Sequence, residues 1–386
     1  MKECKENDKL NIVMLGQKMV PSRAGGVELV LTTMCPIMVE KGIDVTCINR
    51  KGTPADDVFS DGYTVDTYKG VKLKSAATIK AKGLAAMSSS FFASIKAAFG
   101  KYDIVHYHAE GPAAMIWIPK LFKKKCVVTV HGLDWQRAKW QKGFGHKYIK
   151  FGERMLVRYA DEIIVLSENV KNYFKCEYDR DTVFIPNGVS APVVRHPDRI
   201  TDEFGLKGQD YYLSLCRLTE EKGIHYLIEA YNRMNTDRKL VIAGGSSDTD
   251  DYVNRLKLMA AGNSNIIFTG FVSGNLLDEL YSNAYAYILP SDIEGMPLSL
   301  LEAMSYGNAV IVSDIRENAD VIDNMGITFK KGSADDLAEK MTYLDENPEL
   351  SNKLRSSSAK YILDKYNWDN VADRTIELYR KIEESQ

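Results

Sequence analysis

The stretch SDIEGMPLSLLEAMSYGNAVIVSD, residues 291–314, predicts a loop, a helix and a strand in that order. Pro297 is typical of the first helical position, and PLSLLEAMSYG (297–307) has apolar residues at helical spacing. NAVIVSD (308–314) is a short β-branched run typical of a buried strand, and AYAYILP (284–290) is another. The stretch therefore predicts parallel strands joined by a helix.

The same alternation extends over most of the chain. In the first half we predict a helix at 27–42 and strands at 11–15, 44–50, 102–108, 126–132, 161–167 and 181–188. In the second half we predict helices at 223–234, 251–261, 275–284 and 297–307, and strands at 210–218, 239–245, 265–270, 284–290 and 308–314. Such alternation predicts an α/β fold of two doubly wound, Rossmann-like domains facing across a cleft.

The length of 386 residues also favours two domains over one core. Two prolines interrupt the periodicity in SAPVVRHPDR, residues 190–199. We predict a first domain at 1–190, a second at 191–367, and a last helix within 368–386 that crosses back to the first domain.

Composition excludes several classes of protein. A net charge of −2 and 26% charged residues are typical of a globular protein that does not bind nucleic acid. The 6 cysteines are scattered, without CxxC or metal-site spacing, which favours a reducing compartment. The charged N-terminus lacks a signal-peptide pattern, and no apolar run approaches the roughly 18 residues of a spanning helix. We therefore expect a cytoplasmic protein.

Ligands of doubly wound sheets bind outside the carboxyl ends of the strands, and several polar motifs lie there. In RAGGVE (23–28), Gly25 and Gly26 allow close approach of a ligand at a helix start, although an ordinary turn explains them too. In CRLTEEKG (216–223), Arg217 and Lys222 suit a diphosphate, whereas the alternative is a solvated charged loop.

Histidines follow two predicted strands of the first half. VHYHAEGP (105–112) contains His106 and His108, which strand alternation places on one face. HGLDW begins with His131 at a strand's carboxyl end. A metal pair is an alternative interpretation, but a third ligand is lacking, so we predict no metal.

Glu294 and Glu302 flank the predicted helix start. Glu302 lies five residues inside the helix, about 7.5 Å along its axis. The N–H groups near Leu298 and Ser299 suit a phosphate, so the two carboxylates can accept hydrogen bonds from hydroxyls along one extended ligand. The alternative is the carboxylate pair of a glycoside hydrolase, which acts on one bond across about 5–9.5 Å.

These motifs together resemble a known family. EGMPLSLLEAMSYGNAVI matches the Glu-x(7)-Glu signature of retaining glycosyltransferases with the GT-B fold, of the family 4-like type. GGVE, VTVHG, IPNGV and RLTEEKG match further motifs in the family's order and span nearly the whole chain. HGLDWQRAKW resembles a subgroup of surface-polysaccharide hexosyl- and rhamnosyltransferases. That subgroup has GGFE and DGLEW where this chain has GGVE and HGLDW, so a rhamnose donor is not implied.

The resemblance implies roles for the candidate residues. Arg217 and Lys222 bind the donor diphosphate and support its departure, Glu294 holds the hexose and Glu302 the ribose. His131 lies beside the anomeric carbon, so the implied catalytic residues are His131, Arg217, Lys222 and Glu294. Further implied donor contacts are Gly25, Gly26, Val272, Gly295, Met296, Pro297, Leu298 and Ser299. The acceptor-side candidates are His108, Glu110, Asp134 and Trp135.

The resemblance also implies the reaction. The donor is a nucleotide sugar, with a UDP-sugar favoured over GDP- or dTDP-sugars by family frequency, and no further cofactor is required. Transfer to a saccharide or lipid-diphosphate-linked acceptor retains the anomeric configuration through same-face attack, in polysaccharide or glycoconjugate assembly. The competing functions are a nucleotide-sugar epimerase of the same fold and a non-catalytic sugar-binding protein.

Residues 111–160 carry eleven lysines and arginines against two acidic residues, with aromatic residues interleaved. This pattern suits an anionic membrane surface, and we hypothesise peripheral docking at the inner face of the membrane. The alternative is a solvated helix face whose aromatic residues belong to the core.

Overall fold

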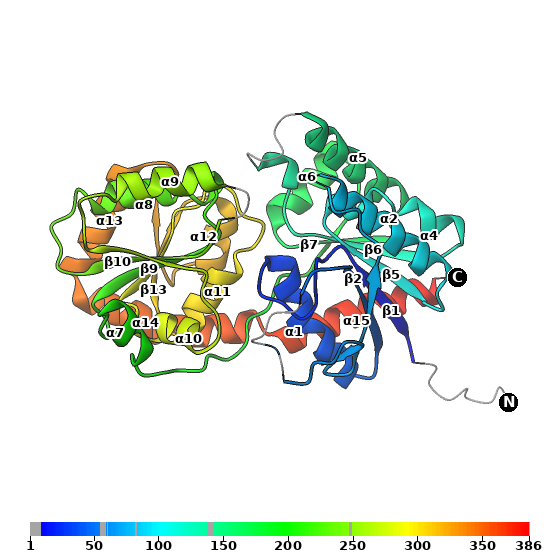
Figure 1. Ribbon diagram of the computed structural model, residues 1–386, viewed down its shortest axis with the longest axis horizontal. Coiled ribbons are helices and arrows are strands. Elements are labelled where there is room, and N and C mark those ends of the chain that lie inside the picture. Colours follow the sequence, from blue (N-terminus) through cyan, green and yellow to red (C-terminus); the bar gives the residue numbers. More distant parts are fainter. Residues whose placement is uncertain are drawn as a thin grey trace. The chain divides into compact units, whose positions relative to one another are not determined.

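A computed structural model describes residues 9–54, 59, 61–81, 83–137, 143–246 and 249–385. The chain divides into two compact units (Figure 1). Unit 1 comprises Met1–Asn187 and Trp368–Gln386, and unit 2 comprises Gly188–Asn367. Each unit is a sheet with helices on both faces, so the predicted pair of doubly wound α/β domains is confirmed.

Among the described residues, unit 1 has a sheet of eight strands in the order β3-β4-β2-β1-β5-β6-β7-β8. All neighbouring strands are parallel except β3, which pairs antiparallel with β4 at the edge. The strands are β1 (Asn11–Leu15), β2 (Asp44–Arg50), β3 (Thr67–Tyr68), β4 (Val71–Ala76), β5 (Ile104–His108), β6 (Lys125–Val130), β7 (Glu162–Val165) and β8 (Val183–Phe184).

The helices of unit 1 cover this sheet. They are α1 (Gly26–Glu40), α2 (Leu84–Phe99), α3 (Glu110–Ala113), α4 (Trp117–Leu121), the 3₁₀ turn η2 (Asp134–Gln136), α5 (Gly143–Tyr159), α6 (Glu168–Tyr178) and α15 (Trp368–Glu384). The last helix, α15, packs against α1, and Lys41 at the end of α1 forms ion pairs with Asp369 and Asp373. The C-terminal helix is thereby part of unit 1.

Unit 2 has a parallel sheet of six strands within the part of the chain that the structure describes, in the order β11-β10-β9-β12-β13-β14. The strands are β9 (Tyr211–Leu215), β10 (Lys239–Ala243), β11 (Ile266–Gly270), β12 (Ala286–Leu289), β13 (Ala309–Ser313) and β14 (Ile327–Phe329). This is the 3-2-1-4-5-6 strand order of a dinucleotide-binding fold, with the order reversing between β9 and β12.

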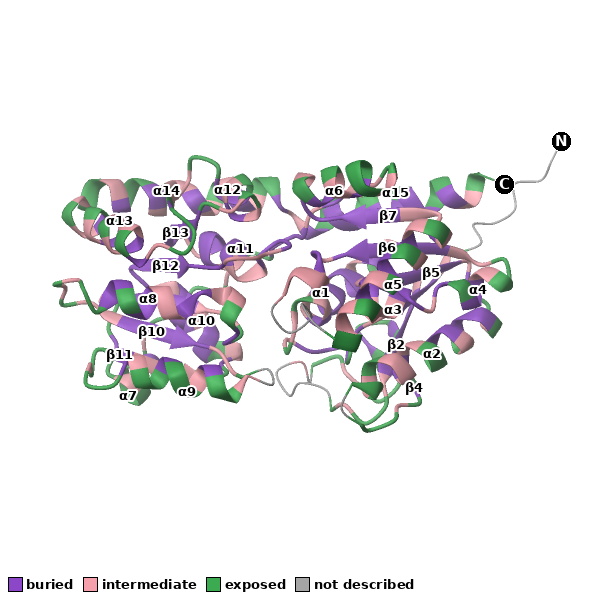
Figure 2. Cartoon of the chain, turned by 90° about the horizontal axis from the view of Figure 1, so that it is seen from above, coloured by how far each residue is buried: buried purple, intermediate pink, exposed green. Residues whose placement is uncertain are grey.

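The helices of unit 2 follow the same alternation. They are α7 (Arg199–Phe204), the 3₁₀ turn η4 (Glu220–Lys222), α8 (Ile224–Tyr231), α9 (Asp250–Met259), α10 (Gly274–Asn283), α11 (Leu298–Ser305), α12 (Arg316–Ile322), α13 (Ala334–Glu346) and α14 (Pro348–Lys365). Most residues of the central strands are buried whereas the helices expose one side, as the colours of Figure 2 show. Burial of the β-branched strand residues between helices is the main force that stabilises each sheet.

Two sequence-based expectations are wrong. Pro297 is not the first helical residue, because its backbone is extended (ψ 104°) and it caps α11, which begins at Leu298. The sequence patterns predict no element within residues 51–100, yet β3, β4 and α2 form there. VKLKSA in β4 has two buried apolar residues alternating with exposed lysines, a pattern that could have identified this strand.

Candidate functional site

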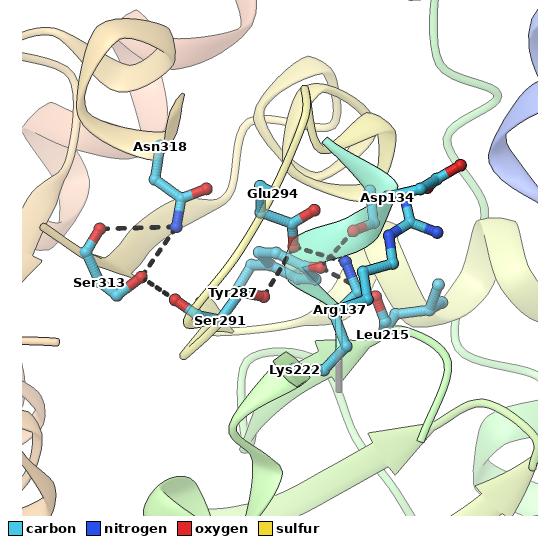
Figure 3. Close-up of polar contacts among 10 residues, drawn as sticks. Asp134, Arg137, Leu215, Lys222, Tyr287, Ser291, Glu294, Ser313 and Asn318 are labelled. Atoms are coloured by element: carbon cyan, nitrogen blue, oxygen red, sulfur yellow. Dashed lines mark hydrogen bonds and ion pairs between the residues drawn. The ribbon is translucent and has the colours of Figure 1, made fainter. Parts of the chain in front are cut away.

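The point where the strand order of unit 2 reverses brings two candidate residues together. Lys222 follows β9 and Glu294 follows β12, and these strands are neighbours in the sheet. Lys222 Nζ lies 2.6 Å from Glu294 Oε1, an ion pair whose side chains are 16% and 6% exposed (Figure 3). Two residues that are far apart in sequence therefore share the position where such sheets bind ligands.

The local backbone explains why the loops that carry Lys222 and Glu294 lie in contact. Gly223 adopts φ +67°, and a Cβ placed there would lie only 2.1 Å from the carbonyl oxygen of Pro290. The loop after β9 can therefore approach the end of β12 closely only with glycine at this position. The Asp292 N–H also donates to the Glu221 carbonyl at 2.8 Å, so the two loops are held against each other.

A chain of hydrogen bonds fixes the Glu294 carboxylate. Ser291 Oγ donates to Glu294 Oε1 at 2.7 Å, and Ser313 Oγ donates to the Ser291 carbonyl at 2.5 Å. Asn318 Nδ2 donates to Ser313 Oγ at 3.0 Å (Figure 3). Because Ser291, Ser313 and Asn318 are buried, Glu294 is held on a rigid support.

The start of α11 lies directly after this loop. The Tyr287 hydroxyl lies 2.8 Å from Ser299 Oγ and 3.0 Å from the Leu215 carbonyl oxygen, which ties the first turn of α11 to the end of β9. One turn further, Glu302 Oε2 accepts a hydrogen bond from the Tyr281 hydroxyl at 3.3 Å. The positive end of α11 thus lies between the two glutamates in sequence, as the spacing predicted.

The other donor-side candidates of unit 2 differ in exposure. Arg217 is exposed two residues after the end of β9, and Val272 is buried after β11. Gly295, Met296 and Pro297 are buried, whereas Leu298 and Ser299 are partly exposed.

The strand order of unit 1 reverses between β1 and β5, and Gly16 lies there. It adopts φ +116°, and a Cβ at this position would lie 2.4 Å from the His108 carbonyl oxygen. The segment after β1 therefore passes directly over the end of β5.

Three imidazoles form a row at these carboxyl ends. The rings of His106 and His108 stack with centroids 4.4 Å apart, which confirms their shared face. His108 Nδ1 lies 3.0 Å from His131 Nε2. Burial lowers the pKa of His106 to about 3 and that of His131 to about 4, and it lowers the pKa of His108 as well. The row is thus electrically neutral near pH 7.

His106 is structural. Its Nδ1 lies 2.5 Å from the Tyr379 hydroxyl of α15 and its Nε2 lies 2.7 Å from Thr129 Oγ1, so both nitrogens have hydroxyl partners. The two-histidine metal site therefore has no support from the geometry. Across the residues described, no group of three or more His, Cys, Asp or Glu is placed to hold a metal ion.

The acceptor-side candidates Glu110 and Asp134 are neighbours. Glu110 is fully buried and its Oε1 accepts the Asp134 N–H at 3.2 Å. Burial, followed by the charge of Asp134, raises the pKa of Glu110 well above its usual range. Asp134 in turn forms an ion pair with Arg137 at 3.2 Å.

Trp135 is fixed by a residue that the sequence reasoning did not select. Glu153 of α5 is fully buried and accepts hydrogen bonds from Trp135 Nε1 at 3.0 Å, Lys150 Nζ at 2.8 Å and the Tyr173 hydroxyl at 2.8 Å. The Tyr178 hydroxyl is a further donor. Lys150 also lies 4.2 Å from the centre of the Trp135 ring. As one of two acids in a basic segment, Glu153 carried a sequence signal that could have identified it.

Gly25 and Gly26 form the start of α1. Gly25 is the extended N-cap residue (φ −159°) and Gly26 is the first, exposed helical residue. Glu28 in the first turn accepts the Lys18 N–H at 2.8 Å, which closes the loop between β1 and α1.

A cavity of about 280 Å³ opens in unit 1 beside these loops. It is bounded by the segments after β1, β5 and β6, by the end of β2, and by α2 and α5. Asp134 is the acceptor-side candidate that lines it. Gln17, Arg50 and Tyr148 also line it and were not selected from the sequence, because no motif marks them.

The basic segment 111–160 contains both exposed and structurally engaged side chains. Trp117, Phe122, Phe144 and Phe151 are exposed, as are Lys123, Lys147, Arg154 and Arg158. Trp135 donates a hydrogen bond to Glu153 instead, and Tyr148 lines the cavity. Lys139, Trp140 and Lys142 lie outside the described residues. A helix long and apolar enough to span a membrane does not occur in the described parts of the chain.

Comparisons with known proteins agree with this architecture. Residues 24–191 match the family model Glycosyltransferase Family 4, and residues 198–361 match Glycosyl transferases group 1. An uncharacterized glycosyltransferase of Methanocaldococcus jannaschii is 27% identical over 72% of this chain and 75% of its own length. The O-antigen chain mannosyltransferase C of Escherichia coli is 24% identical over 74% and 77%, respectively.

Solved structures show the same fold. The sucrose-phosphate synthase of Thermosynechococcus elongatus has a TM-score of 0.81 at 18% identity and covers 98% of this chain and 100% of its own. HepE of Anabaena, in complex with UDP and glucose, has a TM-score of 0.79 at 15% identity over 96% of this chain and 100% of its own. With two glycosyltransferase family models over most of its length, this chain belongs to the glycosyltransferases of the GT-B fold.

Proposed function

We propose that this glycosyltransferase moves a hexose from a nucleotide sugar to a saccharide or lipid-diphosphate-linked saccharide, with retention of anomeric configuration, in polysaccharide or glycoconjugate assembly. The observation that carries the proposal is the Lys222–Glu294 pair at the strand-order reversal of unit 2, directly before the start of α11. A cation, a fixed carboxylate and a helix N-terminus together suit a sugar diphosphate.

The donor binds along this edge of the sheet. The exposed Arg217 and the Lys222 ammonium bind the diphosphate, with the N–H groups near Leu298 and Ser299. Glu294 accepts hydrogen bonds from sugar hydroxyls and Glu302 from the ribose. The buried Val272 borders the base. Gly25, Gly26 and the backbone of Gly295, Met296 and Pro297 contribute the remaining donor contacts.

Stabilisation of the negative charge on the leaving diphosphate lowers the barrier of the reaction. As the anomeric bond ionises, negative charge develops on the leaving diphosphate, and Arg217 and Lys222 stabilise that charge. The leaving phosphate takes the proton of the acceptor hydroxyl, which attacks from the same face. Neutral His131 lies beside the anomeric carbon, where it contributes a hydrogen bond without repelling an oxocarbenium-like centre.

Similarity of fold and sequence supports the proposed nucleotide and acceptor. A UDP-sugar is the favoured donor because HepE of the same fold binds UDP and glucose. Surface polysaccharide is the favoured product class, by similarity to the O-antigen mannosyltransferase. His108, Glu110, Asp134 and Trp135 belong to the acceptor side.

We further propose that unit 1 docks on an anionic membrane surface. Phe99 of α2 and Phe122 after α4 are exposed, with ring centroids 4.6 Å apart, and the exposed Lys123 follows. Exposed aromatic and cationic side chains together suit the headgroup region. Sedimentation with anionic vesicles, weakened by salt, is expected, and absence of binding at low salt contradicts this part.

A direct assay tests the transferase. The protein is incubated with UDP-glucose, UDP-galactose or GDP-mannose and candidate acceptors, and the anomeric linkage of the product is determined by NMR. The proposal predicts an acceptor-dependent product with the donor's configuration. An inverted linkage contradicts retention, and conversion of the sugar nucleotide without an acceptor identifies an epimerase instead.

A further inference from the structure

The cavity of unit 1 occupies the ligand position of its sheet. Gly16 and Gln17 follow β1, Arg50 ends β2, Gly111 follows β5 and Asp134 follows β6, so the cavity lies at the carboxyl ends of four adjacent strands. These strands include β1 and β5, where the strand order reverses. All residues that line it belong to unit 1. Its volume of about 280 Å³ is close to the lower end for small-molecule sites, roughly 300 Å³.

One side of the cavity is apolar. Ile48 of β2, Met87 and Ala93 of α2, and Phe144 and Ile149 of α5 line it. Such a wall suits the C–H face of a sugar ring or another compact group with an apolar face.

The other side has polar groups that lack partners. Gln17 is 2% exposed, and its Oε1 has no hydrogen-bond partner among the described residues. The same holds for the buried Arg50 Nε and the Tyr148 hydroxyl. A buried polar group that has lost water without gaining a partner destabilises the folded protein. Three such groups around one cavity favour a polar ligand that pairs with them.

Arg50 gives the cavity a cationic side. No hydrogen bond or ion pair joins its guanidinium to another residue in the described ranges, whereas the acid lining the cavity, Asp134, is paired with Arg137 at 3.2 Å. Glu28 is an acid whose charge acts on Arg50, but its Oε1 accepts the Lys18 N–H. A planar guanidinium with free N–H donors binds a phosphate or a carboxylate more tightly than it binds a neutral ligand group.

We propose that this cavity binds the acceptor, and that it selects a sugar-sized ring carrying an anionic group, phosphate or carboxylate, held by Arg50. The inference rests on the proposed function, since it assigns the substrate class of that reaction. Gln17 and Tyr148 pair with ring hydroxyls, and α2 and α5 cover the apolar face of the ring.

Binding of three probes by calorimetry tests the assignment. The probes are glucose 1-phosphate, glucuronate and neutral methyl glucoside, each added to the full-length protein with and without UDP. We expect at least one anionic probe to bind ten-fold or more tighter than methyl glucoside. Preference between the two anionic probes identifies the phosphate or the carboxylate as the group that is recognised.

Variants of Arg50 locate the contact. Arg50→Gln is expected to weaken the anionic probe about ten-fold without affecting methyl glucoside, and Arg50→Lys to retain part of the preference. The matched control is Lys51→Gln, which removes the same charge from the neighbouring exposed residue, outside the cavity lining. Ala86→Trp, an exposed position of α2 at the cavity, fills the space and is expected to abolish binding of the probe in a folded protein.

Two results overturn the inference. One is equal or weaker binding of both anionic probes compared with methyl glucoside, and the other is an unchanged preference in Arg50→Gln. UDP binding in the same titrations separates this failure from that of the proposed function. If the protein binds UDP but does not prefer the anionic probes, only the acceptor assignment is wrong. If it binds no nucleotide, the proposed function is wrong.

Discussion

Lys222 Nζ and Glu294 Oε1 lie 2.6 Å apart, although 72 positions separate the residues in sequence. The contact joins the segment after β9 to the segment after β12 at the reversal of the strand order. In the proposed complex the Lys222 ammonium also binds the diphosphate, and the Glu294 carboxylate accepts hydrogen bonds from sugar hydroxyls. The pair thereby holds both groups in place before the donor arrives, which lowers the cost of ordering them.

Replacing Lys222 by methionine should reduce turnover by about 10²–10³-fold, the usual loss when one group that stabilises developing negative charge is removed. The measurement is kcat for transfer under saturating donor. Lys207→Met is the matched control, because Lys207 is an exposed lysine of the same unit. Equal turnover of Lys222→Met and the control contradicts the role of Lys222.

Replacing Glu153 by alanine should destabilise unit 1 by about 3–5 kcal/mol, because the Lys150 ammonium and three aromatic donors lose their acceptor. Chemical denaturation followed by circular dichroism measures the loss. The emission of Trp135 should also change, since its Nε1 loses a hydrogen bond. Glu168→Ala, at an exposed ion pair, should cost less than about 1 kcal/mol. Similar costs for both variants would show that Glu153 does not support the Trp135 loop.

Acid should destabilise unit 1 through its row of histidines. Burial lowers the pKa of His106 to about 3 and of His131 to about 4, below the roughly 6.5 of an unfolded histidine. Between those values the unfolded chain binds protons that the native protein does not, so stability is complete above pH 6.5 and falls as pH decreases. Each histidine contributes up to about 1.4 kcal/mol per pH unit.

Urea denaturation between pH 4.5 and 7 checks this dependence. His131→Gln should reduce the slope of unfolding free energy against pH, because one proton-binding difference is removed. Because the pKa of Glu110 is raised, this carboxyl lowers stability as pH rises above about 4.5, which opposes the effect of the histidines. Wild type and variant both contain Glu110, so the comparison of their slopes still isolates His131. The same slope in wild type and variant would contradict the lowered pKa of His131.

Gly16→Ala should disrupt the reversal point of unit 1. The new Cβ would lie 2.4 Å from the His108 carbonyl, so the backbone must move in addition to bearing the strain of φ +116°. Gly42→Ala isolates the strain, because Gly42 has φ +88° and a Cβ placed there would meet nothing within 4 Å. We expect Gly42→Ala to cost about 1 kcal/mol and Gly16→Ala to cost more, as measured by thermal unfolding. Equal costs would show that the approach to His108 is unimportant.

Much of the fold was predictable because each element carries a local pattern. The strand at 11–15 and the strand at 44–50 match β1 and β2 at both ends, since their apolar runs are bounded by polar residues. The hairpin and helix within 51–100 were not predicted. There β3 has only two residues, and the small residues of α2 give a weak helical pattern.

The site was predictable where motif and strand end coincide. Lys222, Glu294 and His131 all follow strands in recognisable motifs, and the structure places the first two in contact. Glu153, Gln17 and Arg50 were not found, because their importance comes from tertiary neighbours. Glu153 stands out in the sequence only as one of two acids in a basic segment, and an arginine whose Nε has no partner among the described residues has no signature in local sequence.

The proposed division of labour between the two glutamates is the central claim, and calorimetry with UDP and UDP-glucose tests it most directly. Glu302→Ala should weaken both ligands about ten-fold, because it removes the ribose contact. Glu294→Gln should bind UDP as tightly as wild type, yet lose the extra affinity for the sugar and most of the turnover. If both variants bind UDP and UDP-glucose as wild type does and turn over normally, these residues do not hold the donor.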